Sequence, residues 1–92
     1  MQGLDGKVIL VTGATGNLGG AVAKGALVAG AKLALAGRSI ESLERSFVDG
    51  NQVALIPDVD LTDAHSTQCY IERAISRFGR IDGLISTVGG FA

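Results

Sequence analysis

The feature that most restricts how this chain can fold is a continuous apolar run that leads into a glycine-rich loop. Residues 7–12 read Lys-Val-Ile-Leu-Val-Thr, the loop that follows reads Gly-Ala-Thr-Gly-Asn-Leu-Gly-Gly, and a helical pattern then continues to Ala29. An unbroken run of β-branched and aliphatic residues is typical of a strand buried on both faces of a parallel sheet. The segment therefore predicts a central strand, a tight turn and a crossover helix.

Strand and helix patterns alternate along the rest of the sequence. Apolar runs at residues 32–36, 52–56 and 81–88 predict three more strands. The intervals predict one helix that Ser39 caps and that reaches Phe47, and another that begins at Thr62 or Asp63 and reaches Phe78. The inward face expected for the second helix consists of Ala64, Ile71, Ala74, Ile75 and Phe78. Because right-handed crossovers join parallel strands, we expect an α/β fold with a sheet of order 3-2-1-4 and helices on both faces.

The predicted sheet stops after its fourth strand. A strand at the edge of a sheet presents unpaired N–H and C=O groups, and its apolar face would lack the cover of later helices. We therefore expect the exposed fourth strand and its apolar face to support a homo-oligomer or contact with another partner.

Composition and charge narrow the classes of partner. Charges of both signs are interspersed and the formal net charge is −1, so we expect neither nucleic acid nor a membrane as a partner. No apolar run approaches the roughly 18 residues that cross a bilayer. Cys69 and His65 are the only cysteine and histidine, which excludes an internal disulfide and predicts no metal site of the four-ligand zinc kind. A single thiol fits a reducing, cytoplasmic location.

The glycine spacing of the loop points to a nucleotide phosphate. Gly13 permits the turn, Gly16 lets the backbone approach a pyrophosphate, and Gly19 lets the helix pack close to the sheet. The N–H groups at the helix N-terminus favour the anion, and Thr15 and Asn17 can add hydrogen bonds. The alternative is a glycine-rich turn that only connects packed elements. A Walker-type loop is excluded because no Gly-Lys-Ser/Thr follows.

The end of the second predicted strand bears on which dinucleotide would bind. NAD-selective sites usually place a carboxylate about 20 residues beyond the glycine loop, whereas this sequence has Arg38 and Ser39. A guanidinium beside a hydroxyl suits a 2′-phosphate, so NADP(H) is expected to be preferred over NAD(H). The alternative is that Arg38 is an ordinary solvated side chain.

These segments together resemble the short-chain dehydrogenase/reductase family from Leu4 to Gly90. The opening is similar to the family's Gly-Lys-Val-x-Leu-Val-Thr-Gly-Ala, and Asp60-Leu61-Thr62-Asp63 is similar to its adenine-contacting segment. The resemblance implies a Rossmann-type fold and one partial NAD(P)-binding domain over residues 1–92. It implies that the cofactor-binding set is Gly13, Thr15, Gly16, Asn17, Leu18, Gly19, Arg38, Ser39, Asp60, Leu61, Val88 and Gly89.

Two positions depart from the commoner branch of that family. Asn17 stands where that branch has glycine. The spacing of Gly13, Gly16 and Gly19 is instead similar to that of the family's extended and atypical branches. Ser86-Thr87-Val88-Gly89 replaces Asn-Asn-Ala-Gly beside the nicotinamide-side ribose, so the asparagine contacts are lost.

The family's catalytic Ser, Tyr and Lys are expected beyond residue 92, so we assign no catalytic residue to this segment. Tyr70 is followed four residues later by Ala74 rather than by Lys, and Cys69 with His65 lacks an orienting carboxylate. The resemblance therefore implies the NADP(H)-binding portion of an oxidoreductase whose full-length relatives transfer hydride between the cofactor and an alcohol or carbonyl. The alternative is a non-catalytic module that senses NADP(H) or assembles with itself.

Overall fold

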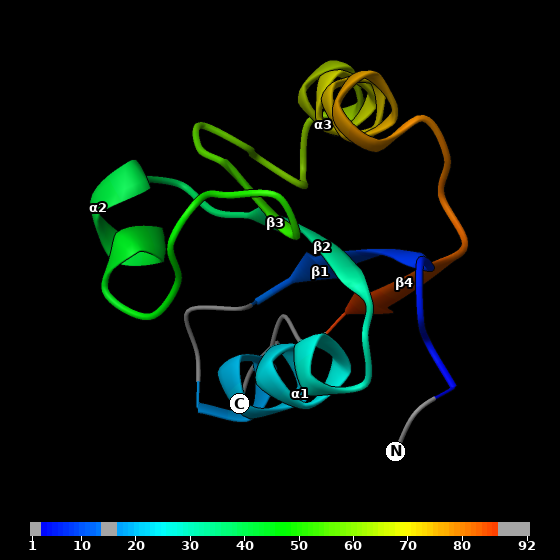
Figure 1. The fold of residues 1–92 in the computed structure, drawn as a ribbon. Helices are drawn as coiled ribbons and strands as arrows, with labels where there is room; N and C mark the ends of the chain where they lie inside the picture. The colour runs from blue at the N-terminus through cyan, green and yellow to red at the C-terminus, as the bar shows by residue number, and fades with distance from the viewer. Residues whose placement is uncertain (1–2, 14–16, 87–92) are drawn as a thin grey trace.

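The computed structural model describes residues 3–13 and 17–86, in which strands and helices alternate (Figure 1). The strands are β1 (Val8–Thr12), β2 (Lys32–Ala36), β3 (Val53–Ile56) and β4 (Gly83–Ser86). The helices are α1 (Asn17–Val28), α2 (Ile40–Glu44) and α3 (Ala64–Phe78). Among the described residues, no helix is both long and apolar enough to cross a membrane.

The four strands form one parallel sheet in the order β3-β2-β1-β4. Thr12 is level with Ala36 on one side and with Ser86 on the other, and Ala36 is level with Ile56. The carboxyl ends of all four strands therefore meet at one edge of the sheet. The predicted strand order is confirmed.

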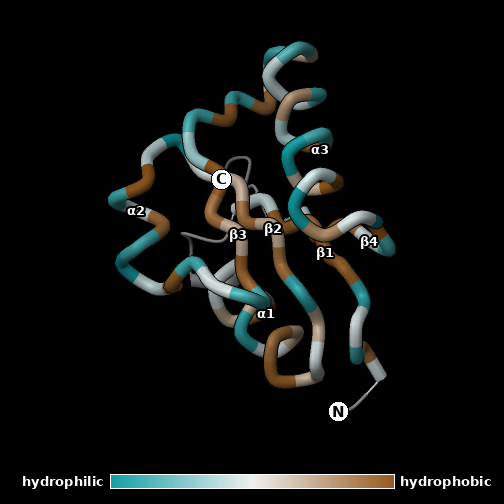
Figure 2. The backbone as a smooth tube through the Cα atoms, turned by 45° about the horizontal axis from the view of Figure 1, so that its top comes forward, coloured by the Kyte–Doolittle hydropathy of each residue, from teal (hydrophilic) through white to brown (hydrophobic). Residues whose placement is uncertain are grey.

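Helices cover both faces of the sheet, as predicted. In Figure 1, α1 lies on one side of the strands and α3 on the other. On the α1 side, Ala23 and Ala26 pack with Leu33 and Leu35, and Leu43 of α2 joins the same buried cluster. The cluster on the α3 side contains Leu10, Ala34, Ile56, Tyr70 and Ala74. Figure 2 shows hydrophobic residues concentrated along the central strands, as expected for strands buried on both faces.

Local capping explains where helix α3 begins and ends. Asp63 takes the N-cap position, and its side chain accepts a hydrogen bond from the backbone N–H of His65. Gly79 ends the helix in a left-handed conformation, with φ at 83°, that glycine adopts without a Cβ penalty. Both predicted boundaries are confirmed, with Asp63 rather than Thr62 as the cap.

The inward face predicted for α3 is partly wrong. Ala74 is buried and Phe78 is half-buried, but Ala64, Ile71 and Ile75 are exposed. Within residues 3–13 and 17–86 the sheet ends at β4, so the described sheet is narrower than the apolar stripe of the helix. Tyr70 instead fills the centre of this interface and is 2% exposed.

Helix α2 is shorter than predicted, and strand β4 begins later than predicted. Helix α2 ends at Glu44, although Phe47 is still buried after the turn that follows. The chain then bends toward β3, where the carboxylate of Asp49 accepts a hydrogen bond from the backbone N–H of Leu55. Strand β4 begins at Gly83 rather than Ile81, and the predicted continuation to Val88 lies outside the described residues.

Candidate functional site

The loops that follow β1, β2 and β3 enclose a hollow at the carboxyl edge of the sheet. It has a volume of about 320 Å³ and is lined by Gly13, Ala36, Gly37, Arg38, Val59, Asp60, Leu61 and Thr62. Five of the residues that the sequence assigned to cofactor binding are among or beside these: Gly13, Arg38, Asp60 and Leu61 line the hollow, and Ser39 follows Arg38 in the chain. Crevices at this edge of a parallel sheet are the usual ligand sites of such folds.

Two glycines shape the floor of the hollow. Gly13 has φ at 80°, in the left-handed region that other residues rarely adopt. At Gly37, an added Cβ would lie 2.8 Å from Cγ of Leu43, the buried residue of α2. Gly37 was not among the predicted site residues, because what restricts it is this contact with Leu43.

Backbone hydrogen bonds fix the loop after β2 against the loop after β3. The N–H of Val59 donates to the carbonyl of Gly37 at 3.0 Å, and the N–H of Asp58 donates to the carbonyl of Arg38 at 3.3 Å. Asp58 has φ at 62°, and buried Val59 anchors the turn from beneath. These bonds hold Arg38 and Asp60 at one hollow although they come from different crossovers.

Asp60 is held on one side by its own loop. Its Oδ1 accepts hydrogen bonds from the hydroxyl of Thr62 at 2.6 Å and from the N–H of Thr62 at 3.0 Å. These bonds, the hydroxyl first, lower the pKa of Asp60, and the charge of Arg38 adds a smaller effect. Oδ2 has no hydrogen-bond partner within residues 3–13 and 17–86, so one oxygen of an ionised carboxylate remains to accept a donor.

Arg38 and Ser39 differ in the hydrogen bonds that their side chains form. The exposed guanidinium of Arg38 has no hydrogen bond or ion pair in the described part of the chain, and it also borders a smaller hollow beside Asp58 and Asp60. Ser39 caps α2, where its oxygen accepts from the N–H of Ser42 at 3.2 Å. The hydroxyl oxygens of Ser39 and Ser42 also lie 2.9 Å apart, in a hydrogen bond that either hydroxyl could donate. Because a hydroxyl proton can rotate, that of Ser39 can turn to another acceptor.

The structure describes only part of the predicted phosphate loop. Thr15, Gly16, Val88 and Gly89 lie outside the described residues. Asn17 begins α1, whose first turn therefore stands directly after the loop, and Leu18 follows within the helix. Gly19 is buried in the same turn, and its role in letting the helix pack close to the sheet stays a prediction.

A second, larger hollow lies between α3 and β4. It has a volume of about 400 Å³ and is lined by Leu10, Thr12, Leu61, Thr67, Tyr70, Ile71, Ile81, Leu84 and Ser86. These lining residues include no charged side chain, so they offer no cation to a phosphate. Its rim includes Leu84, which is 64% exposed, and it corresponds to the apolar face predicted beside the fourth strand.

Tyr70 serves packing rather than catalysis. Its hydroxyl donates to the backbone carbonyl of Ala34 at 2.5 Å and lies 3.4 Å from that of Val11. Burial raises the pKa of Tyr70 well above its ordinary value. A phenol that is buried, neutral and hydrogen-bonded to the sheet is unsuited to proton transfer.

Comparison with known proteins identifies the family. The model for short chain dehydrogenases matches residues 7–92. The chain belongs to the short-chain dehydrogenase family. An uncharacterised oxidoreductase of Listeria monocytogenes is 33% identical over 89 residues, which cover 94% of this chain and 36% of that protein. This short-chain dehydrogenase segment therefore spans about a third of that relative.

Solved structures of this family share the fold. The L-sorbose reductase of Gluconobacter frateurii, solved with NADPH and L-sorbose, superposes with a TM-score of 0.82 at 27% identity, over 99% of this chain and 36% of that one. The 3-ketoacyl-(acyl-carrier-protein) reductase of Brucella melitensis, solved with NADH, gives 0.80 at 31% identity, over 89% and 34%. Family members of this fold thus include one solved with each cofactor.

Proposed function

We propose that this short-chain dehydrogenase segment is the NADP(H)-binding portion of an oxidoreductase. The observation that carries the proposal is the hollow in which Gly13, Arg38 and Asp60 meet. It combines a backbone open to close approach with two groups that keep bonding capacity among the described residues: a cation with no ion pair and a carboxylate with one oxygen that accepts no hydrogen bond. These are the groups needed for a pyrophosphate, a 2′-phosphate and an adenine amino group.

Each part of the dinucleotide has a proposed contact. The pyrophosphate would lie at Gly13 and the first turn of α1, with Thr15, Gly16, Asn17, Leu18 and Gly19. Arg38 and Ser39 would bind the 2′-phosphate, Asp60 and Leu61 the adenine, and Val88 and Gly89 the nicotinamide-side ribose. The bound cofactor supplies the hydride donor or acceptor, and this chain's residues hold and orient it.

The preference for NADP(H) rests on the end of β2. Arg38 follows that strand by two residues, and the first carboxylate after it is Glu41, on helix α2. Arg38 has no ion pair among the described residues and so can bind a phosphate, and no carboxylate at residues 37–39 opposes it. The full protein would then reduce a carbonyl, or oxidise an alcohol, with NADP(H). A cytoplasmic location remains our proposal from the single cysteine.

Calorimetric titration of the whole chain with NADPH and with NADH tests this proposal. The folded state is checked beforehand by circular dichroism. Saturable binding with NADPH tighter than NADH supports it. Tighter binding of NADH, or no binding of either by a folded sample, overturns it.

A second candidate function is self-assembly, which the exposed edge of the sheet favours. Within the described residues, β4 pairs only with β1, and Leu84, which borders the hollow between α3 and β4, is 64% exposed. We propose that a second copy of this chain pairs along β4 and covers Leu84, Ile71 and Ile75. In sedimentation velocity, Leu84→Lys should shift the protein toward monomer, whereas Val28→Lys, at an 83% exposed site on α1, should not. A monomeric parent protein at micromolar concentration would exclude this assembly.

A further inference from the structure

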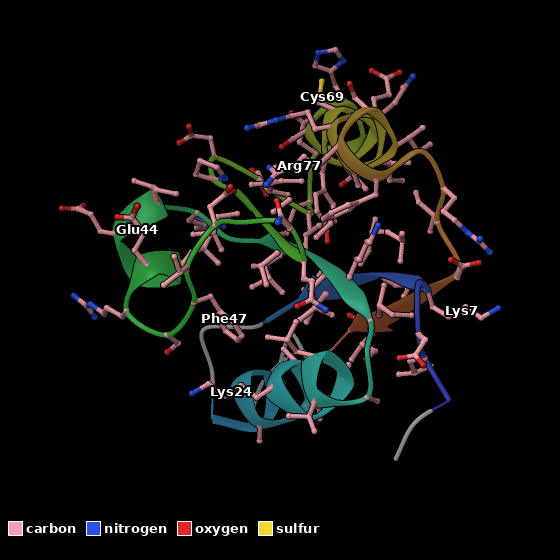
Figure 3. The ribbon with its side chains drawn as sticks, viewed as in Figure 1. Lys7, Lys24, Glu44, Phe47, Cys69 and Arg77 are labelled. Atoms are coloured by element: carbon pink, nitrogen blue, oxygen red, sulfur yellow. The ribbon has the colours of Figure 1, made fainter. Side chains whose placement is uncertain are left out.

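A pair of potential metal ligands lies on helix α3, and neither residue lines any of the three hollows. Cys69 and His65 are one helical turn apart, and Figure 3 shows Cys69 on the side of α3 that points away from the sheet. Cys69 is half-buried and His65 is exposed, so an ion can approach from solvent. The sulfur of Cys69 lies 3.7 Å from Nε2 of His65.

The separation of these two atoms matches the bite of a tetrahedral ion. Zinc binds thiolate sulfur at about 2.3 Å and imidazole nitrogen at about 2.0 to 2.1 Å, and a tetrahedral angle of about 109° then holds the two ligand atoms about 3.6 Å apart. The observed 3.7 Å needs almost no rearrangement to accept such an ion. Thiolate and imidazole ligands also favour zinc, whereas magnesium and calcium favour oxygen ligands.

Neither side chain is committed to the fold. The only hydrogen-bond partner of each side chain within the described residues is the other member of the pair. Helix α3 packs through Tyr70 and Ala74 on its opposite side, and its N-cap uses only the backbone of His65. A helix with both ends capped keeps an i, i+4 pair at fixed spacing, so little conformational entropy is lost on binding.

We propose that Cys69 and His65 form a two-ligand site for a divalent metal ion of the zinc class. No group of three or more potential ligands gathers within residues 3–13 and 17–86, so this site differs from a closed structural zinc site. Two of the four coordination positions of the ion are left for water or for Cys69 and His65 of a second copy. Binding is therefore weaker than in a four-ligand site and reversible.

Titration of the whole, reduced chain with Co²⁺ tests the site directly. Cobalt bound to a thiolate gives a charge-transfer absorption in the near ultraviolet, which added Zn²⁺ should abolish by displacing the cobalt. The end point gives one ion per chain if water completes the site and one per two chains if a second copy does, and either supports the proposal. Absence of the absorption overturns it.

Co²⁺ titration of variants distinguishes a site made by both residues from binding to the Cys69 thiol alone. Cys69→Ser should lose the absorption. Because loss of an outer-shell partner alone costs about 10- to 100-fold in metal affinity, His65→Ala should weaken Co²⁺ binding at least about tenfold. Glu72→Gln is the matched control, since this neighbouring carboxylate is bonded by Gln68 and should leave binding unchanged. Unaltered binding by His65→Ala overturns the proposal. All three variants should bind NADPH like the parent chain, since none of these residues lines the hollow at Arg38.

Discussion

Asp82 and Val8 are joined by two hydrogen bonds that tie the start of β4 to the start of β1. Oδ2 of Asp82 accepts from the N–H of Val8 at 2.8 Å, and the N–H of Asp82 donates to the carbonyl of Val8 at 2.8 Å. Arg80 donates to Oδ1 at 2.6 Å and so holds the carboxylate in place. These hydrogen bonds of Asp82, which we call the Asp82 clamp, support the register in which Thr12 pairs with Ser86 at the ends of β1 and β4. The hydroxyl groups of Thr12 and Ser86 form a hydrogen bond of 3.0 Å there.

Because of the Asp82 clamp, we expect the folded chain to lose stability as pH falls. The hydrogen bond from Arg80, followed by that from the N–H of Val8, lowers the pKa of Asp82 below its ordinary value. A carboxyl whose pKa is lower in the folded state stabilises the fold at pH values above its unfolded pKa, and this stability is lost as pH falls through the folded pKa. Asp49 and Asp60 also have lowered pKa values and act in the same direction.

Thermal unfolding of the parent chain and of Asp82→Asn, measured from about pH 6 to about pH 3, checks this prediction. The midpoint of the parent should fall on acidification, and that of Asp82→Asn should be lower at pH 6 and fall less steeply. Glu41→Gln is the control, because Glu41 is exposed and has no ion pair in the described residues. Equal slopes for parent and Asp82→Asn would contradict the role given to this carboxylate.

Tyr70→Phe should destabilise the chain by about 1 kcal/mol, because it removes a buried hydrogen bond but keeps the ring. The hydroxyl contacts Ala34, in the central strand β2, and the ring fills the interface between α3 and the sheet. Urea unfolding followed by circular dichroism measures the change. An increase in the free energy of unfolding would show that the hydroxyl is poorly accommodated at this position.

The order of strands was predictable, whereas the lengths of elements and the depth of burial were only partly so. Alternating apolar runs and caps fix which element follows which, and right-handed crossovers leave one arrangement for such a chain. The stripe on α3 gave no information on how far the sheet extends beneath it. For this reason Ile71 and Ile75 were predicted inside and are exposed, while Tyr70 was not predicted to occupy the centre.

The site was predictable where a residue acts through its place in the motif. Gly13, Arg38 and Asp60 lie in the loops that follow strands whose carboxyl ends must meet, so their convergence follows from the order of the sheet. Gly37 was missed because its constraint is the distance to Leu43, a contact between α2 and the loop that no local pattern encodes.

Gly37→Ala should destabilise the chain by about 1–3 kcal/mol, the cost of overpacking, because the added Cβ meets Leu43. It should also weaken NADPH binding, since Gly37 lines the hollow. Gly50→Ala is the matched control, because a Cβ there meets nothing within 4 Å. Urea unfolding and calorimetry check both effects. An unaffected Gly37→Ala would mean that Leu43 moves freely.

Arg38→Ala should weaken the binding of NADPH much more than the binding of NADH. The 2′-phosphate of NADPH is the only group that NADH lacks, and a hydrogen bond to a charged group contributes about 1.5–3 kcal/mol. Loss of the guanidinium should therefore weaken NADPH binding about tenfold or more and leave NADH binding nearly unchanged.

Calorimetric titrations with adenosine 2′,5′-bisphosphate and with adenosine 5′-phosphate test the role of the 2′-phosphate without the nicotinamide half of the cofactor. Arg38→Ala should weaken only the bisphosphate. Arg45→Ala is the matched control, since Arg45 is exposed at the end of α2 and does not line the hollow. Asp60→Asn should weaken both nucleotides equally, because the adenine is common to them. An equal loss of both nucleotides in Arg38→Ala would instead place Arg38 at a group that they share, and the expected preference for NADP(H) would then have no basis in this hollow.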